Sequence, residues 1–214
     1  MAIRTSSRAS KCPQLTVKGN GDQQQHGGQT TATTDANSCS DDDSDDLLPD
    51  HFISEATVAW VQLMLDSWES QVLGGEPLIP DRSGSSSTEV QQAQQLANLR
   101  YAVVSHDFLR NKEDPIFVYA NTLALQTFGY EWDEFVQMPS RKSCGEEGQE
   151  ERSAYLRTVL EDKEQVSAAN YSGVRLKKSG ESFLIAETVL WNVIDQQGNL
   201  VGQACRIASS TPLP

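Results

Sequence analysis

Cationic side chains are scarce in this sequence. Its 214 residues contain 17 Lys and Arg against 30 Asp and Glu, which gives a formal net charge of −13. Nonspecific binding to nucleic acid or to an anionic membrane depends on clustered Lys and Arg that meet phosphate groups, and no such basic patch is present. Long apolar runs are also absent, because none approaches the roughly 18 residues that a membrane-spanning helix requires. These absences predict a soluble cytoplasmic protein with neither nucleic-acid nor membrane partners.

Cysteine is sparse as well. The four cysteines, Cys12, Cys39, Cys144 and Cys205, have neither CxxC nor paired spacing, so we expect free thiols, no disulfide framework and no metal site. The chain also lacks the patterns typical of enzymes, such as a Ser-His-Asp order, HExxH, or GxGxxG on a strand-to-helix turn. We therefore expect no catalytic residues and no enzyme activity.

The first 50 residues are polar and low in complexity. They contain few large apolar side chains and carry an acidic cluster at 41–46. Because such a segment cannot bury enough apolar surface to offset its ordering entropy, we expect residues 1–50 to be a disordered tail. Residues 1–21 contain several Arg and Lys but no acid, which is also the composition of an organelle transit peptide. An organelle-targeted protein is therefore the alternative to a cytoplasmic one.

Residues 51–100 are predicted to form two helices joined by a linker. Apolar residues recur at spacings of three and four from Ser54 to Leu73, and Gly74-Gly75 stand where this helix should end. A linker rich in Pro, Gly and Ser spans 77–87, and a helical pattern resumes at 88–99. The apolar face of the first helix consists of Val58, Val61, Leu65, Trp68 and Val72. We expect this face to pack on the rest of the domain, or to form an interface with a second copy or a regulatory partner.

The remainder of the chain alternates between strand and helix patterns. Strands are predicted near 101–105, 116–120, 168–177, 182–193 and 200–208, with helices at 121–129, 131–136 and 149–162. Asn121 is placed to cap the first of these helices, and Gly129 to end it. In the strand 182–193, strict alternation puts one set of side chains on a single face: Phe183, Ile185, Val189, Trp191 and Val193. Two strands, then helices, then three strands is the element order of a PAS-type sensor domain. We therefore predict an α+β fold with a five-stranded antiparallel sheet and helices packed on one face.

Several motifs in this part of the chain carry a more specific resemblance. They are Phe117-Val-Tyr-Ala-Asn121, Leu125, Phe128-Gly-Tyr130, Trp132-Asp-Glu-Phe135, Pro139-Ser-Arg141, Tyr171-Ser-Gly-Val-Arg175, Trp191-Asn192 and Gly202-Gln203. In this order they resemble the MEKHLA domain, a PAS-like family, and the similarity runs from about Val61 to Ile207. As a domain boundary, we predict the PAS-like MEKHLA domain at 101–208, after the two helices of 51–100.

The resemblance also indicates which kind of member this chain is. The MEKHLA domain occurs at the carboxyl terminus of plant class III homeodomain-leucine zipper factors, and as stand-alone proteins in bacteria and algae. This chain has no homeodomain, basic region or heptad zipper, so it resembles the stand-alone type and the DNA-binding role does not transfer. The resemblance implies a PAS-like fold with a role in ligand sensing or in controlling association.

Side chains that could bind a ligand are spread over the predicted sheet and its loops. Arg141 and Arg175 offer planar guanidinium groups that match a carboxylate or phosphate. Either could instead form a salt bridge to Asp133, Glu134 or Glu187 of this chain. On strand 168–177, Tyr171, Gly173 and Arg175 share one face, where the glycine leaves room between ring and cation. Trp191 and Gln203 could add stacking and amide contacts, or could be an ordinary core residue and a solvent-facing one. The full set of ligand-pocket candidates is His106, Tyr119, Arg141, Tyr171, Arg175, Trp191 and Gln203.

The familiar PAS cofactors have little support in these residues. Cys144 lies roughly where flavin-binding PAS domains place their reactive cysteine, but the segment Ser140-Arg-Lys-Ser-Cys-Gly-Glu146 does not resemble the motif of those domains. The helix at 149–162 contains no His that could bind haem, and His106 is a lone histidine beside a carboxylate. We therefore expect neither flavin nor haem, and the sequence leaves the ligand unknown.

These patterns favour one function and leave two others open. The first is a non-enzymatic PAS-like regulatory or sensory module that binds a small organic ligand or controls dimerisation. The alternative is a protein–protein interaction module that docks through the apolar face of the helix at 54–73. A third hypothesis, an enzyme that acts on small polar substrates through Tyr171, Arg175 and His106, has no motif in its support.

Overall fold

The computed structural model describes residues 48–214, apart from 73–75, 81, 83–86 and 162–167. Four predictions lie mainly or wholly outside the described residues: the disordered tail, the transit peptide, the amino-terminal cysteines and the helix stop at Gly74-Gly75.

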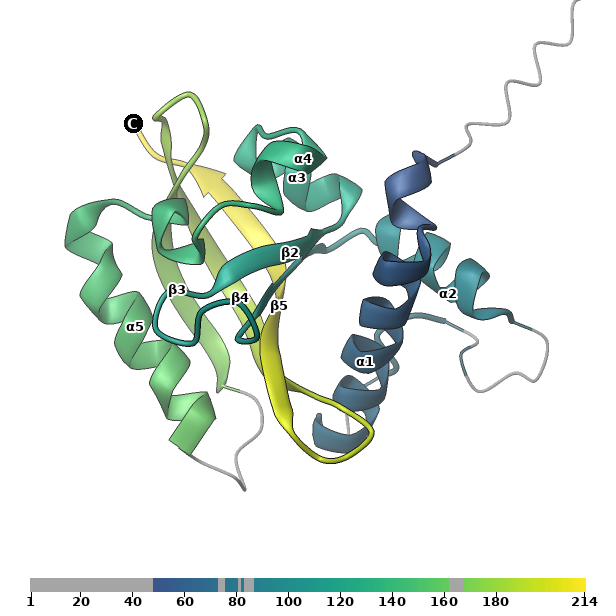
Figure 1. Ribbon diagram of the computed structural model, residues 1–214. Coiled ribbons are helices and arrows are strands. Elements are labelled where there is room, and N and C mark those ends of the chain that lie inside the picture. The colour runs from purple at the N-terminus through teal and green to yellow at the C-terminus, as the bar shows by residue number, and fades with distance from the viewer. Residues whose placement is uncertain (1–47, 73–75, 81, 83–86, 162–167) are drawn as a thin grey trace, which may run out of the picture. The chain divides into compact units, whose positions relative to one another are not determined.

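The described elements follow the predicted order (Figure 1). A short 3-10 turn η1 (Asp50–Phe52) precedes the helices α1 (Glu55–Gln71) and α2 (Glu89–Ala97). The strands β1 (Ala102–Asp107) and β2 (Ile116–Ala120) follow, and then α3 (Thr122–Phe128), α4 (Trp132–Phe135), the 3-10 turn η2 (Ser140–Ser143) and α5 (Glu146–Glu161). The last three strands are β3 (Ala168–Leu176), β4 (Ser182–Ile194) and β5 (Leu200–Pro212). The strand β5 is longer than predicted, because it continues past residue 208 along β4.

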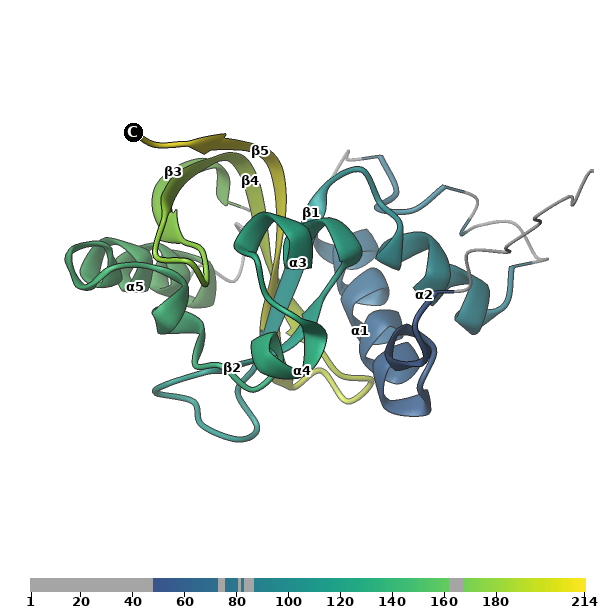
Figure 2. The same cartoon turned by 90° about the horizontal axis from the view of Figure 1, so that it is seen from above.

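The five strands form one antiparallel sheet in the order β2-β1-β5-β4-β3, which confirms the predicted α+β fold class. Helices α3, α4 and α5 lie on one face of this sheet, and α1 and α2 lie on the other (Figures 1 and 2). Each face has its own apolar core. Val103 and Trp191 belong to the core beneath α1, whereas Val104 and Phe183 belong to the core beneath α3 and α4.

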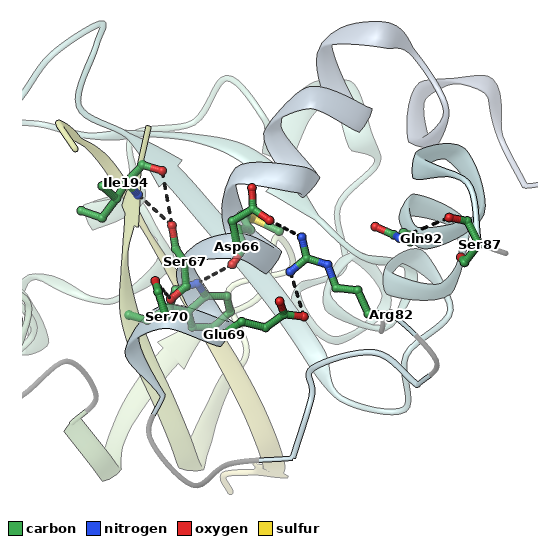
Figure 3. Close-up of polar contacts among 10 residues, drawn as sticks. Asp66, Ser67, Glu69, Ser70, Arg82, Ser87, Gln92 and Ile194 are labelled. Carbon is green, nitrogen blue, oxygen red and sulfur yellow. Dashed lines mark hydrogen bonds and ion pairs between the residues drawn. The ribbon is translucent and has the colours of Figure 1, made fainter. Parts of the chain in front are cut away.

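The helix α1 is held to the sheet by both apolar and polar contacts. Val61 and Leu65 are 0% and 1% exposed. The indole Nε1 of Trp191 donates to the Met64 carbonyl oxygen at 3.0 Å, and Ser67 Oγ accepts from the Ile194 amide at 2.8 Å. Figure 3 shows this Ser67–Ile194 contact at the sheet-facing side of α1. The first helix therefore packs on its own domain, which was one of the two expected outcomes for its apolar face.

An arginine ties the segment after α1 back onto that helix. Arg82 contacts the carboxylates of both Asp66 and Glu69, and the Glu69 pair has an N–O distance of 3.0 Å (Figure 3). Both acidic side chains lie largely in solvent, with exposed fractions of 60% and 48%. Such an exposed pair is worth at most about 1 kcal/mol, so the buried apolar contacts dominate the docking of α1.

The prediction for the two faces of β4 is wrong. Phe183 and Ile185 pack in the core beneath α3 and α4, whereas Trp191 and Val193 pack in the core beneath α1. Between these pairs, Glu187 has a φ of 53°, a left-handed conformation that side-chain-bearing residues rarely adopt. This residue interrupts the regular alternation, so side chains before and after it cannot be assigned to faces by counting in twos.

Candidate functional site

A small cavity lies between α5 and the sheet, with a volume of about 50 Å³. Its apolar wall includes Phe117, Phe128, Ile185, Leu190 and Ile207. The polar side chains at the cavity are His106 of β1, Ser143 of η2, Arg152 and Tyr155 of α5, Tyr171 and Arg175 of β3, and Gln203 of β5. The structure thus brings together four predicted ligand-pocket candidates, which are His106, Tyr171, Arg175 and Gln203.

Helix α5 supplies a buried cation that the sequence analysis missed. Arg152 is only 7% exposed, and its Nη2 donates to Ser140 Oγ at 2.6 Å. It lies in a stripe with Tyr155, Leu156 and Val159, at spacings of three, four and seven, which is the pattern of a helix face turned inward. A charged residue at the start of such a stripe was the available signal. Sequence reading passed over it because the rest of α5 is rich in charge.

The strand β3 supplies the second cation. Arg175 is 7% exposed, and its guanidinium carbon lies 5.5 Å from the centroid of the Tyr171 ring. That ring stacks in turn on Tyr155 of α5, with centroids 4.1 Å apart and an interplanar angle of 15°. A Cβ atom at Gly173 would collide with the Tyr171 side chain, so the glycine leaves the space that the ring occupies. The predicted Tyr171–Gly173–Arg175 face therefore exists.

The two guanidinium groups give the cavity an unbalanced positive charge. Within the described part of the chain, neither Arg152 nor Arg175 makes an ion pair. Burial, and to a smaller extent repulsion from Arg175, lowers the pKa of Arg152 to about 10. Arg152 therefore stays protonated at neutral pH, and its electrostatic repulsion from Arg175 persists.

His106 contributes a neutral polar group to the same wall. It is 4% exposed, and burial, with a smaller contribution from Arg152, lowers its pKa to about 3. The neighbouring Gln203 amide acts in the opposite direction, but more weakly. Neither His106 Nε2 nor Gln203 Oε1 has a hydrogen-bond partner among the described residues. The imidazole is therefore uncharged at neutral pH and adds nothing to the positive charge of the cavity.

Gln203 also connects the cavity wall to α5. Its Nε2 donates to the Leu156 carbonyl oxygen at 3.2 Å and to Asn192 Oδ1 at 3.1 Å. Asn192 Nδ2 donates in turn to the Val159 carbonyl oxygen at 2.9 Å. The amide side chains of Asn192 on β4 and Gln203 on β5 thus hold the inner face of α5. Of the two, Gln203 lines the cavity.

The three remaining ligand-pocket candidates lie elsewhere. Tyr119 is 1% exposed in the core beneath α1, with its ring centroid 5.9 Å from that of Trp132. Trp191 fills the same core, so both side chains lie on the opposite side of the sheet from the cavity. Arg141 is exposed, and its Nε pairs with Asp114 at 3.0 Å. Its partner is thus a carboxylate of this chain, although not one of those considered from the sequence, which were Asp133, Glu134 and Glu187.

The interface candidates on α1 are covered by the chain itself. Val58, Val61, Leu65 and Trp68 are all buried, and Val72 packs against the same core. Cys144, at the end of η2, is 3% exposed and does not line the cavity, and its thiol donates to the Arg141 carbonyl oxygen at 3.2 Å.

A larger depression lies between α1, α2 and the sheet, with a volume of about 1310 Å³. It is an open surface feature, and its lining includes Arg206. That guanidinium already stacks on two rings, 4.8 Å from the Tyr101 centroid and 5.5 Å from the Trp68 centroid. The small cavity beneath α5 is therefore the better candidate site, because its cations are buried and unpaired.

Two features are absent from the described residues. No three His, Cys, Asp or Glu side chains in the described ranges gather closely enough to hold a metal ion. Over the same ranges, no helix combines the length and the apolar character needed to span a membrane.

Comparison with known proteins identifies a family for this sequence. The MEKHLA domain family model matches residues 58–211, so the match begins within α1 and ends within β5. No curated protein sequence matched the chain. Similar solved structures include the PAS domain of a protein from Colwellia psychrerythraea, at 15% identity and a TM-score of 0.48, covering 57% of this chain and 94% of that one. They also include a Light-Oxygen-Voltage domain studied with a flavin analogue, at 21% identity and a TM-score of 0.44, covering 61% of this chain and 89% of that one. An RNA-binding Light-Oxygen-Voltage receptor is similar at 18% identity and a TM-score of 0.43, over 52% of this chain and 30% of that one.

Proposed function

Because this chain belongs to the MEKHLA domain family, and because its fold is PAS-like, we propose that it is a non-enzymatic regulatory module that senses a small organic ligand. The ligand binds in the cavity between the sheet and α5. The observation that carries this proposal is the gathering of Arg152, Arg175, His106 and Gln203 around one small cavity. His106 Nε2 and Gln203 Oε1 have no hydrogen-bond partner among the described residues, and each guanidinium group makes only one hydrogen bond there, so a ligand would supply further partners.

The contacts of α5 suggest how binding would be transmitted. Gln203 touches the cavity and also donates to the Leu156 carbonyl oxygen, so a ligand that engages its amide competes with or reinforces that contact. Arg152 belongs to the same helix and faces the same space. Ligand binding is therefore coupled to the position of α5 on the sheet, and α5 is the element through which a signal would reach a partner.

The titratable groups at the cavity favour binding over catalysis. A base with a pKa of about 3, as at His106, is too weak to remove a proton efficiently at neutral pH. Burial raises the pKa of the Cys205 thiol to about 12, so the nucleophilic thiolate is scarce. These two groups are poorly suited to general-base or nucleophilic chemistry.

Intact-mass measurement on the full-length protein tests the proposal. We expect native mass spectrometry to show a mass excess that disappears on denaturation, with an ultraviolet-visible spectrum of the same sample to detect a chromophore. The variant Cys205→Leu, which adds volume to the cavity wall, should lose the excess, whereas Leu109→Ala, at a 72% exposed position, should keep it. A native mass equal to the polypeptide mass, together with no binding from a panel of small acids, bases and neutral compounds, would refute a ligand-sensing cavity.

The alternative proposal is an interaction module that docks through α1. This function requires α1 to leave the sheet, which would expose Val61, Leu65 and Trp68 to water. Burial of each such side chain contributes about 1.5–3 kcal/mol, so a partner would have to replace that stabilisation. A partner-induced rise in hydrogen exchange at the amides of β4 and β5 that lie beneath α1 would support this alternative over the sensing cavity.

A further inference from the structure

The cavity beneath α5 contains two buried cations without an anion in contact. We propose that it binds a short-chain carboxylate, held between Arg152 and Arg175; this inference rests on the proposed sensing function and names its ligand class. Both guanidinium groups are 7% exposed and line the same cavity. Proteins that bury a charge generally provide a counter-charge, because an unpaired buried ion carries a large desolvation penalty. Here no described carboxylate contacts either guanidinium group: Asp114 acts on Arg152 only as a weak, more distant charge, and the two cations also repel each other.

The hydrogen-bonding capacity of the two arginines is also largely unused. A guanidinium group carries five N–H donors. Among the described residues, Arg152 donates only to Ser140 Oγ at 2.6 Å, and Arg175 donates only to the Val174 carbonyl oxygen at 2.9 Å. The remaining donors can form the paired, parallel hydrogen bonds that a planar oxyanion accepts from arginine.

The size and lining of the cavity narrow the ligand class. A volume of about 50 Å³ holds only a few heavy atoms, which excludes a flavin, a haem or a nucleotide in this arrangement. Much of the remaining wall is apolar, formed by side chains such as Phe117, Ile185 and Leu190. An anion with a short hydrocarbon end, such as acetate or propionate, satisfies both sides, whereas nitrate and chloride leave the apolar wall without a partner.

His106 is uncharged at neutral pH, so the positive charge of the proposed anion site comes from the two arginines. With a pKa of about 3, it remains uncharged near pH 7 and presents one ring N–H and one ring nitrogen acceptor. The groups that face it are Arg152 from α5 and Gln203 from β5. Carboxylate affinity should therefore change little between pH 6.5 and 8, because His106, with a pKa of about 3, and Arg152, with a pKa of about 10, keep their charge states across that range.

The test uses the full-length protein and follows thermal unfolding and isothermal titration with sodium acetate and sodium propionate. Propionamide, at the same concentration and at matched ionic strength, is the neutral control. We expect a saturable rise in Tm with both carboxylates and none with the amide. The variants Arg175→Gln and Arg152→Gln should each weaken carboxylate binding at least tenfold. Arg141→Gln should leave binding unchanged, because that arginine is exposed and paired with Asp114.

The variants also separate loss of binding from loss of folding. Removing one of two repelling buried cations should leave the Tm of the ligand-free protein equal or higher, so a weakened carboxylate response in a fully folded variant identifies the site. Arg175→Lys keeps the charge but loses the planar fork, and it should also bind more weakly.

Four outcomes would overturn the inference. Equal binding of nitrate or chloride would show an inorganic anion site, and an unchanged response in both arginine variants would place any carboxylate site elsewhere. If no anion binds while a neutral compound gives the mass excess on native mass spectrometry, the sensing function stands and its ligand class is wrong. If neither anion binding nor a mass excess is found, the sensing function fails as well.

Discussion

Asn121 Oδ1 accepts a hydrogen bond from the Val103 amide at 2.9 Å, and so joins the start of α3 to the start of β1. The same oxygen accepts from the Ala124 amide at 3.0 Å, which is the helix cap expected from the sequence. Its Nδ2 donates to the Tyr101 carbonyl oxygen at 2.8 Å. One fully buried side chain therefore fixes a helix terminus and the entry into a strand at the same time.

We expect Asn121→Ala to lower the free energy of unfolding by about 3 kcal/mol. The substitution leaves buried backbone groups of β1 and α3 without partners, at about 1–3 kcal/mol each, and it also removes the cap. Asn121→Asp should restore only part of the loss, because a carboxylate can accept from the two amides but cannot donate to Tyr101. Urea titration of both variants measures the effect. Asn98→Ala, at an exposed position, is the control, and an equal loss in this control would contradict the assignment.

Polar substitution on the inner face of α1 should unfold the protein rather than dissociate an assembly. Val61→Asp with Leu65→Asp places two carboxylates in a core where the side chains are 0% and 1% exposed. We expect the free energy of unfolding to fall by more than about 4 kcal/mol. Each change removes apolar burial and places an unpaired carboxylate, or the protonated carboxylic acid, in the core. Circular dichroism on thermal unfolding checks this, with the exposed Ala59→Asp of the same helix as control. A folded double variant with a smaller sedimentation mass than wild type would instead support an interface through α1.

Acid should destabilise the protein through His106. In the folded state its pKa is about 3, whereas an unfolded histidine has a pKa near about 6.5. Between these values the unfolded chain binds the proton and the folded chain does not, so stability is lost as the pH falls through this window. Because proton binding is coupled to unfolding, the contribution of this residue lowers the free energy of unfolding by about 1.4 kcal/mol between about pH 7.5 and pH 5.5.

Comparison with a non-titrating variant isolates that contribution. In His106→Gln the difference in unfolding free energy between the two pH values should be smaller than in wild type by about that amount, measured by urea titration at each pH. Burial also lowers the pKa of His51, but this residue is present in both proteins and its contribution cancels. Identical pH dependence in the two proteins would show that His106 is not buried in a neutral state.

The parts of this structure that could be predicted are those with local signals. The cap at Asn121 and the left-handed Gly129, with a φ of 73°, follow from residue type and position. The faces of β4 could not be predicted, because the residue in the left-handed conformation is Glu187, and neither glycine nor asparagine marks the position.

The candidate site was predictable only in part, for a related reason. Alternation along a strand separates its two faces but does not say which face borders a cavity, so Tyr119 and Trp191 were grouped with His106 and Gln203. Arg152 was missed because a charge on a helix is usually in solvent, and only the packing of α5 on the sheet buries it. The interaction between Arg152 and Arg175 is a tertiary relationship between elements distant in sequence.

Substitution of Gly173 should disturb the cavity without removing any of its polar groups. A Cβ at this position would meet the hydroxyl end of Tyr171, so in Gly173→Ala the ring must move away from β3. The movement breaks the stacking of Tyr171 on Tyr155 and removes the ring from beneath Arg175. We expect a loss of about 1–3 kcal/mol in stability, as for other overpacking changes, together with a changed near-ultraviolet tyrosine signal. Ser172→Ala, at the exposed neighbouring position, should change neither property. If Gly173→Ala retains the wild-type stability and tyrosine spectrum, the Tyr171 ring does not lie over the glycine, and the stacked arrangement that orients Arg175 toward the cavity would have to be abandoned.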